Sequence, residues 1–553
     1  LRSRIYLRLS LPVKTHAATS ASFLRLLCLF AATLPLFTGC AKKSAAPSPA
    51  SSTQTLRLSQ RNEPGTLDPA TATLPDEFAI LRSLSEGLLI PGSSGTEPLP
   101  GAAERYDVSA DGLTYTFHLR RDAVWSNGDP VTAADFVASY RRVVTPATAA
   151  PKAGVFFSVE NAAALVQGGV ADPAALGIHA TDTHTLVIKL TCPNPRFPHY
   201  VASGPWLPVH LPTVATHGRK WIEPGNFVGN GPFVLAEWRP HQRIVVKKNP
   251  RWHGAAGVRL GEIQFLHFDN GDAEDRAYRA GQIDATMAVP NSKVDVYATE
   301  RAAELHRAPM IETRYLTFNT KRPALADARV RRALLHALDR PALAAKVARG
   351  GQQSASSFLP DTLPFDAKVA HAPLPEIAFD PAAARRLLAE AGFPEGKGFP
   401  RLELTGWVNN PILDATQQMW KQHLGIDVAI LIREAKVHQA SLQAGTYDIG
   451  FITEIPEVAD ATVMLAEFIT GSPENYPQWS DPAYDALLAR ILATAAPADR
   501  ARLQLEASAH LIQAAPVAPL YYNTKIWLMS PRIRGWQEDG LWSRTYQGVY
   551  FAN

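Results

Sequence analysis

The amino-acid sequence predicts an α/β protein built from several domain-sized units. Short runs that alternate polar and apolar residues, as half-buried strands do, recur between stretches whose apolar residues have helical spacing. At about 150 residues per domain, the 553 residues correspond to three or four units. Hydrophobic residues make up 46% of the chain and charged residues 19%, so the chain can bury a large core.

The strand predictions rest on alternation at period two. Leu113–Leu119 (LTYTFHL) alternates polar and apolar residues and follows the turn signal Asp111-Gly112. The same pattern predicts further strands over residues 185–190, 243–247 and 517–529.

The helix predictions rest on apolar spacing combined with cap residues. Residues 132–143 (TAADFVASYRRV) begin with a threonine suited to capping a helix. Residues 327–348 are predicted to form two helices broken near Pro341. Residues 380–391 begin with Asp380-Pro381 and stop at Gly392, and residues 482–514 are predicted to be helical in two pieces.

The amino-terminal segment has the features of a secretory signal. A basic stretch precedes the apolar run 23–37, which is shorter than the ~20 residues that a spanning helix needs. The run ends in Leu36-Phe37-Thr38-Gly39-Cys40, which resembles a lipobox, although Phe37 stands where leucine is usual. We therefore predict a signal peptide over residues 1–39 and lipidation of Cys40, with an ordinary signal peptide and an incidental cysteine as the alternative.

The stretch after the cysteine is suited to an anchor. Residues 40–55 are rich in Ala, Ser and Pro without apolar periodicity, which predicts a flexible tether. Acyl chains on Cys40 would hold the body at a membrane as a periplasmic or cell-surface lipoprotein. Cys28 would leave with the leader, so Cys192 has no partner for an intramolecular disulfide in the mature body.

The distribution of charge argues against a nucleic-acid partner. The formal net charge is +4, but five of the 55 basic residues and none of the 51 acidic ones precede Cys40. The remaining 50 basic and 51 acidic residues make a nearly neutral body, without the positive surface that nucleic-acid binding requires.

The sequence also lacks the common motifs of catalysis. It has no GxGxxG after a strand, no Walker loop, no HExxH, no GxSxG and no CxxC. The 16 histidines are scattered without metal-ligand spacing. We therefore predict a protein that is not an enzyme, with no catalytic residues, no metal and no cofactor.

Four segments in order carry a resemblance to a known family. They include ERYDVSADGLTYTFHLRRDAVWSNGDPVTAADFVASYRRV within Ala103–Val143, VGNGPFVLAEW within Val228–Trp252, ARVRRALLHALDR in the segment from Asn319 to Arg340, and YPQWSDPAYDALL from Tyr476 to Leu488. With Leu67-Asp68-Pro69, the resemblance spans about residues 56–550. In these segments the chain resembles the family 5 extracellular solute-binding proteins, the peptide-binding receptors of ABC importers.

The resemblance implies a bilobal periplasmic-binding-protein type II fold with an extra inserted domain and mixed sheets flanked by helices. Lobe I would comprise residues 56–85, 203–312 and 522–553. The inserted domain would cover residues 86–202, and lobe II residues 313–521. Ligand would bind between the lobes, which close over it by a hinge.

The resemblance also implies candidate binding residues. In peptide-binding relatives an acidic side chain of lobe II pairs with the ligand's α-ammonium. Aligned without a gap from Tyr447-Asp448, that carboxylate falls on Glu457, and Asp460 matches the acidic residue three positions further on. Glu454 stands where relatives often carry tryptophan, and a solvated loop carboxylate is the alternative role for Glu457.

Four further positions match residues that face ligand or hinge in relatives. They are Tyr315 and Asn319, in a strand that crosses between lobes, and Trp407 and Asn409, at a strand end. Tyr315 and Asn319 could equally be packing groups. Ala435 replaces an aromatic residue that lines side-chain pockets in oligopeptide binders. This difference weakens the prediction of a peptide ligand and leaves the prediction of the fold unaffected.

The function expected from this resemblance is capture of short peptides and their delivery to an ABC permease, by a monomer anchored to a membrane. Two alternatives stay open. The same receptor fold could bind a non-peptide solute, or the protein could be a peptide sensor without import. The altered loop over residues 450–461 is the main support for a different ligand.

Overall fold

A computed structural model of the chain describes residues 54–60, 62–92, 97–364, 378–538, 540–542 and 544–552. Residues from Thr53 to Asn553 form one compact unit. The predicted signal peptide (1–39), Cys40 and most of the predicted tether lie outside the described residues; the first strand already includes Gln54 and Thr55. Among the described residues, no helix is long and apolar enough to cross a membrane.

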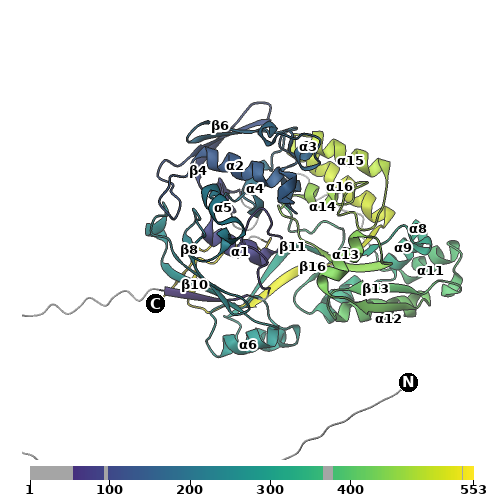
Figure 1. Ribbon diagram of the computed structural model, residues 1–553. Helices are drawn as coiled ribbons and strands as arrows, with labels where there is room; N and C mark the ends of the chain where they lie inside the picture. The colour runs from purple at the N-terminus through teal and green to yellow at the C-terminus, as the bar shows by residue number, and fades with distance from the viewer. Residues whose placement is uncertain are drawn as a thin grey trace, which may run out of the picture. The chain divides into compact units, whose positions relative to one another are not determined.

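Three sheets of four or more strands organise the described chain (Figure 1). The first has the order β1-β10-β9-β8, in which β1 and β10 are parallel and the other pairs antiparallel. Its strands are β1 (Gln54–Gln60), β8 (Phe233–Arg239), β9 (Arg243–Lys248) and β10 (Leu260–His267). The helix α1 (Pro75–Leu84) shares its apolar core.

The second sheet is antiparallel throughout, with the order β4-β5-β7-β6. Its strands are β4 (Ala103–Val108), β5 (Thr114–Leu119), β6 (Ile178–Asp182) and β7 (Thr185–Lys189). The helix α2 (Ala133–Val144) packs on it and begins after the predicted cap residue Thr132, whose N–H donates a 2.8 Å hydrogen bond to the Asp135 carboxylate. In the core, Trp206 stacks on Phe156 with ring centroids 4.0 Å apart.

The third sheet has six strands in the order β12-β16-β11-β15-β13-β14. β13 is parallel to both neighbours, whereas the remaining pairs are antiparallel. Its strands are β11 (Leu305–Phe318), β12 (Gln353–Ser354), β13 (Leu402–Gly406), β14 (Val428–Ile432), β15 (Ile449–Glu454) and β16 (Val517–Leu528). Two short pairs complete the strands, β2 (Leu89–Ile90) with β3 (Leu99–Pro100) and β17 (Ile533–Arg534) with β18 (Tyr550–Phe551).

The long strands β11 and β16 connect the first sheet region to the third (Figure 1). The end of β16 lies beside the first sheet, because the Thr286 N–H donates to the Leu528 carbonyl and Met529 bridges to Ala285. The β11–β16 register is interrupted between Pro309 and Thr313, so the ladder is irregular midway along both strands. Such an irregularity locally weakens the ladder and lets the strands bend.

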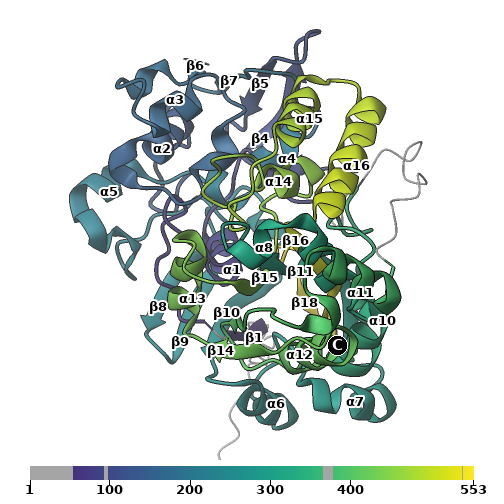
Figure 2. The ribbon, with the colours of Figure 1, turned by 90° about the vertical axis from the view of Figure 1, so that its right-hand side faces the viewer.

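Figure 2 shows how the helices lie around the sheets, and helices form in each segment that the sequence predicted to be helical. The predicted pair 482–514 is α15 (Pro482–Ala493) and α16 (Pro497–Ala514). The predicted break near Pro341 separates α9 (Ala328–His336) from α10 (Arg340–Ala342), which runs into a π-helical turn rather than a regular helix. The others are α3 (Ala162–Val166), α4 (Phe197–Val201), α5 (Leu211–His217), α6 (Gly271–Arg279), α7 (Val294–Glu300), α8 (Pro323–Ala326), α11 (Pro381–Glu390), α12 (Pro411–Leu424), α13 (Ala435–Gln443) and α14 (Ala461–Ala466).

Two motifs of the sequence have a structural explanation. In VGNGPF, a Cβ on Gly229 would lie 2.0 Å from the Leu84 carbonyl oxygen, so only glycine permits this approach to the end of α1. In ARVRRALLHALDR, the buried Arg331 donates to the carbonyls of Ala514 and Ala515, which end α16. A guanidinium at a helix carboxyl terminus satisfies carbonyls that lack partners within the helix.

Candidate functional site

Three of the predicted site residues, Trp407, Asn409 and Glu457, follow the carboxyl ends of strands of the six-stranded sheet. β13, β14 and β15 are parallel to one another, so their carboxyl ends meet at the same edge. Trp407 directly follows β13, and Glu454 is the last residue of β15. In open α/β sheets, ligands bind outside the carboxyl ends of the strands. The segment from Glu454 to Asp460 then leads into α14.

Glu457 forms an ion pair with Lys152, a residue 305 positions earlier that lies in the range predicted as the inserted domain. Each side chain is 24% exposed, so the pair is largely withdrawn from water. Burial lowers the pKa of Lys152, but the charge and hydrogen bond of Glu457 outweigh it and hold that pKa above its ordinary value. The carboxylate predicted to bind an ammonium therefore already contacts one, through Oε1.

Three further glutamates surround this pair. Glu454 and Glu467 are 8% and 9% exposed and share a hydrogen bond. Burial raises the pKa of Glu454 to about 7, and burial together with the charge of Glu454 raises the pKa of Glu467 well above its usual range. Burial of its carboxyl also raises the pKa of Glu474, although much of that side chain remains exposed.

Asp460 makes its contacts within the protein. Its Oδ1 accepts hydrogen bonds from the Thr462 N–H at 2.9 Å and from Gln504 Nε2 at 3.0 Å. Its Oδ2 lies 3.5 Å from Arg500 and 3.4 Å from the Tyr200 hydroxyl. The residue therefore caps α14 and joins α16 to the region that contains α4.

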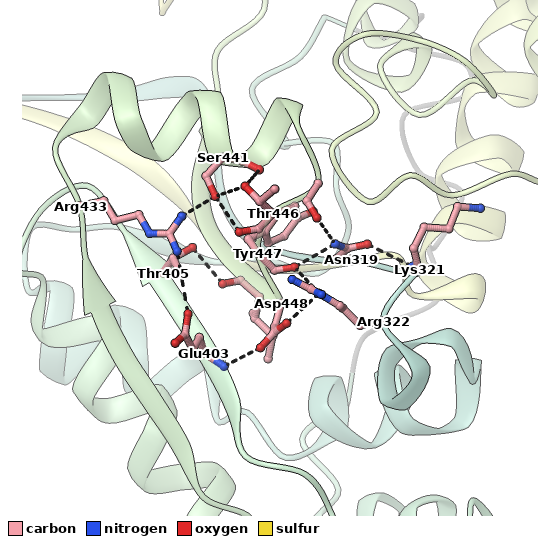
Figure 3. A network of polar contacts seen from close by, with 12 residues as sticks. Asn319, Lys321, Arg322, Glu403, Thr405, Arg433, Ser441, Thr446, Tyr447 and Asp448 are labelled. Carbon is pink, nitrogen blue, oxygen red and sulfur yellow. Dashed lines mark hydrogen bonds and ion pairs between the residues drawn. The ribbon is translucent and has the colours of Figure 1, made fainter.

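Asn319 organises the loop that precedes β15 (Figure 3). Its side-chain amide donates to the carbonyls of Gly445 at 3.0 Å and Tyr447 at 2.8 Å. Arg322 joins the same network through the Tyr447 carbonyl and the Asp448 carboxylate. The network holds the chain where β15 begins, so Asn319 acts on the site through the placement of that strand.

Replacing Asn319 by alanine is expected to lower the free energy of unfolding by about 1–3 kcal/mol, because two carbonyls next to a buried side chain lose their donor. Urea unfolding followed by circular dichroism measures the effect. Asn409→Ala is the matched control, because Asn409 is exposed and should change stability by less than about 0.5 kcal/mol. Equal losses in the two variants would contradict this role of Asn319.

The remaining predicted residues lie at different depths. Tyr315 is buried in the core of the six-stranded sheet, where its ring meets Phe358 edge-on at 5.2 Å. Trp407 is half-buried and stacks on Phe451, with ring centroids 5.3 Å apart. Asn409 is exposed.

Several functional candidates escaped the sequence reasoning. Lys152, Glu467 and Glu474 were not predicted, because no spacing links residues that only the fold brings together. Arg314 was also missed; its guanidinium lies over the Trp407 ring at 5.5 Å and pairs with Glu312 at 2.9 Å. No sequence signal singles out Arg314, because β11 also contains the charged residues Arg307 and Glu312.

The described residues contain no group of three or more His, Cys, Asp or Glu side chains that could hold a metal ion. Cys192 is a half-buried free thiol. The chemistry available at the edge of the six-stranded sheet is therefore that of carboxylates, ammonium and guanidinium groups and aromatic rings, which bind charged and apolar parts of a ligand.

The fold places charged and aromatic side chains at the carboxyl ends of parallel strands, where α/β proteins bind ligands, so fold and site are those of a ligand-binding protein. The sequence matches the bacterial extracellular solute-binding proteins, family 5 (middle region), over residues 97–476. The chain belongs to this family.

Two relatives from Escherichia coli (strain K12) illustrate the similarity. The chain is 33% identical over 497 residues to the probable deoxycholate-binding periplasmic protein YgiS, covering 89% of this chain and 92% of that relative. It is 33% identical over 496 residues to the periplasmic murein peptide-binding protein MppA, covering 88% and 91%.

Solved structures of similar proteins agree with this family assignment. The Escherichia coli murein tripeptide binding protein MppA overlays with a TM-score of 0.81 at 31% identity, covering 90% of this chain and 99% of that one. Haemophilus influenzae OppA in complex with the peptide RPPGFSPFR overlays with a TM-score of 0.79 at 28% identity, also covering 90% and 99%. The predicted family and fold class are confirmed.

Proposed function

We propose that this protein is an extracytoplasmic receptor that captures short peptides and delivers them to an ABC permease for import. The family assignment and a relative named as a murein peptide-binding protein support this function, as does the relative whose structure contains a peptide. The protein acts by binding and closure, without turnover of the peptide and without a cofactor.

The ion pair between Glu457 and Lys152 is the observation that carries the proposal. An ammonium is held on the same carboxylate that the resemblance assigns to the ligand's α-ammonium. Lys152 contacts Oε1, and within the described chain Oε2 accepts no hydrogen bond. A peptide ammonium can therefore pair with Oε2, in surroundings where the half-buried carboxylate favours a charged partner.

We propose further that the lobes divide as the sequence predicted, with lobe I at 56–85, 203–312 and 522–553, the inserted domain at 86–202 and lobe II at 313–521. The register interruption between Pro309 and Thr313 supports a hinge at the lobe boundary. Bending there would move Glu457 relative to Lys152, so that their ion pair forms on closure.

The other candidate residues have two kinds of role in this proposal, contact with the ligand and positioning of the site. Trp407, Asn409 and Arg314 would line the ligand-facing edge, whereas Tyr315, Asn319 and Asp460 would position it through their contacts inside the protein. The ammonium anchor is Glu457.

We propose that Cys40 carries a lipid and that the receptor works as a monomer outside the cytoplasmic membrane, periplasmic or at the cell surface. The lipobox-like sequence and the periplasmic relatives support this location. Incorporation of labelled palmitate by cells that express the chain with its leader, compared with Cys40→Ser, tests the anchor. Membrane label retained by Cys40→Ser would exclude it.

The peptide proposal is tested by native mass spectrometry and titration calorimetry of the unit from Thr53 to Asn553 with a tripeptide library. Glu457→Gln is expected to weaken peptide binding about 100-fold, because a half-buried charge pair with the α-ammonium is lost. Amino-terminal acetylation of the peptide should have a similar effect. Glu300→Gln, an exposed change on α7, is the control and should bind as the wild type does.

A non-peptide solute is the second candidate, and the similarity to a probable deoxycholate-binding protein favours it. The same titrations therefore include deoxycholate. Binding of deoxycholate with no binding of any tripeptide would replace the peptide proposal by this one.

A further inference from the structure

The cluster around Glu457 has more negative charge than its one lysine can balance. Lys152 interacts electrostatically with Glu457, Glu474 and Glu454, and Glu467 interacts with Glu454 and Glu474. The four glutamates and the lysine are therefore one electrostatic unit. Its single cation already contacts Glu457 directly.

Glu467 has a buried carboxyl oxygen, Oε2, that lacks a hydrogen-bond partner among the described residues. Its side chain is 9% exposed. Its interaction with Glu454 joins two acids, which requires them to share a proton. The two nearby arginines are engaged elsewhere. Arg500 pairs with Asp460, and the Arg196 guanidinium donates to the Ala459 carbonyl.

Two other buried carboxylates of the described chain, those of Glu77 and Glu312, have several hydrogen-bond donors each. Glu77 accepts hydrogen bonds from four backbone N–H groups, those of Gly65, Thr66, Thr73 and Leu74. Glu312 accepts from the Thr453 hydroxyl and from Trp542, and it pairs with Arg314. A buried carboxyl without such donors is costly to keep, so the Glu454–Glu467 pair differs from the carboxylates that stabilise the fold.

We propose that Glu454, Glu467 and Glu474 form a second cation subsite, which takes the ammonium or guanidinium group of a basic side chain near the amino terminus of a peptide ligand. This inference rests on the proposed peptide-binding function and adds a ligand preference to it. An organic cation fits better than a metal ion, because the described side chains present no group of three acidic or histidine ligands with metal-binding geometry.

The position of the subsite decides which ligand residue it recognises. Glu454 lies three residues before Glu457, and Lys152 interacts with both carboxylates, so the subsite adjoins the anchor for the α-ammonium. A lysine or arginine at the first or second position of the peptide can reach the subsite while its amino terminus pairs with Glu457. On binding, the second cation allows both carboxyls to ionise, and the shared proton leaves to solvent.

Titration calorimetry at pH 7 with two isosteric peptides tests the subsite. Lys-Ala-Ala is expected to bind wild-type protein about 30-fold more tightly than norleucine-Ala-Ala, because only the lysine forms a charged hydrogen bond there. In Glu454→Gln and in Glu467→Gln this ratio should fall below about 5-fold. Glu300→Gln is the control and should keep the wild-type ratio.

Proton release provides a second readout, obtained by repeating the titrations in buffers of different ionisation enthalpy. Lys-Ala-Ala should release protons on binding, whereas norleucine-Ala-Ala should not. Equal affinities for the two peptides, or a ratio unchanged in both glutamine variants, would overturn the subsite while leaving the peptide receptor intact. Failure of both peptides and of Ala-Ala-Ala to bind would instead overturn the proposed function and the subsite with it.

Discussion

Replacing Asp460 by alanine is expected to lower the free energy of unfolding by about 3–5 kcal/mol, which is the usual cost of removing one partner of a buried ion pair. The Asp460 and Arg500 side chains are 2% and 5% exposed. Alanine would leave the Arg500 charge buried without its carboxylate, and the Thr462 N–H at the start of α14 without its cap. The expected loss is therefore one of folding and is present without ligand.

Urea unfolding of the ligand-free protein measures this effect. Asp499→Ala is a suitable control, because Asp499 is 56% exposed and forms its ion pair with Arg502, which is exposed too. An exposed pair of this kind contributes less than about 1 kcal/mol. If Asp460→Ala is no more destabilising than Asp499→Ala, the assignment of a structural role to Asp460 is wrong. A loss of ligand affinity in such a stable variant would place Asp460 in the binding site.

The second large effect is a pH dependence of stability that originates at Glu454. The pKa of this carboxyl is raised from its ordinary 4.5 to about 7 by burial, in surroundings that contain Glu467, Glu474, Glu457 and Lys152. Between these two values the folded protein keeps a proton that the unfolded chain releases, so stability falls as the pH rises through the window. The loss amounts to about 3 kcal/mol by pH 8 and is absent below pH 4.5.

Comparison with Glu454→Gln isolates this contribution from those of other titrating groups. Glutamine resembles the protonated acid in shape and does not ionise. The stability of Glu454→Gln relative to wild type should therefore increase by about 3 kcal/mol between pH 4.5 and pH 8, as measured by urea unfolding of ligand-free protein. The difference between Glu300→Gln and wild type should stay constant, since Glu300 is exposed. A constant difference for Glu454→Gln as well would contradict the raised pKa.

The local elements of the fold could be predicted because their signals are local. The alternation in residues 113–119, the Thr132 cap and the Asp380 cap each depend on neighbours within a few positions, and each element forms as expected in β5, α2 and α11. The helix beyond Pro341 differs: only a short turn forms, and it continues as a π-helical segment. The buried Arg340, which donates to the Pro519 carbonyl, is a tertiary contact that no local pattern contains.

The candidate site could be predicted only in part. The alignment from Tyr447-Asp448 singled out Glu457 as the candidate anchor, but its ion pair with Lys152 joins residues 305 positions apart. The buried state of Glu454 and Glu467 likewise depends on packing against segments distant in the sequence. Exposure and partners decide whether a carboxylate binds ligand, caps a helix or shares a proton, and neither follows from residue type.

By itself, the sequence determined the α/β class, the order of the elements, the family and the position of one candidate anchor, because periodicity, caps and motifs are properties of short stretches. Only the tertiary structure decided that Asp460 caps α14 beside Arg500, that Asn319 holds the start of β15, and that four glutamates share one lysine. The physical reason is that charge–charge interaction and desolvation depend on distance in space, which the fold sets after the local elements have formed.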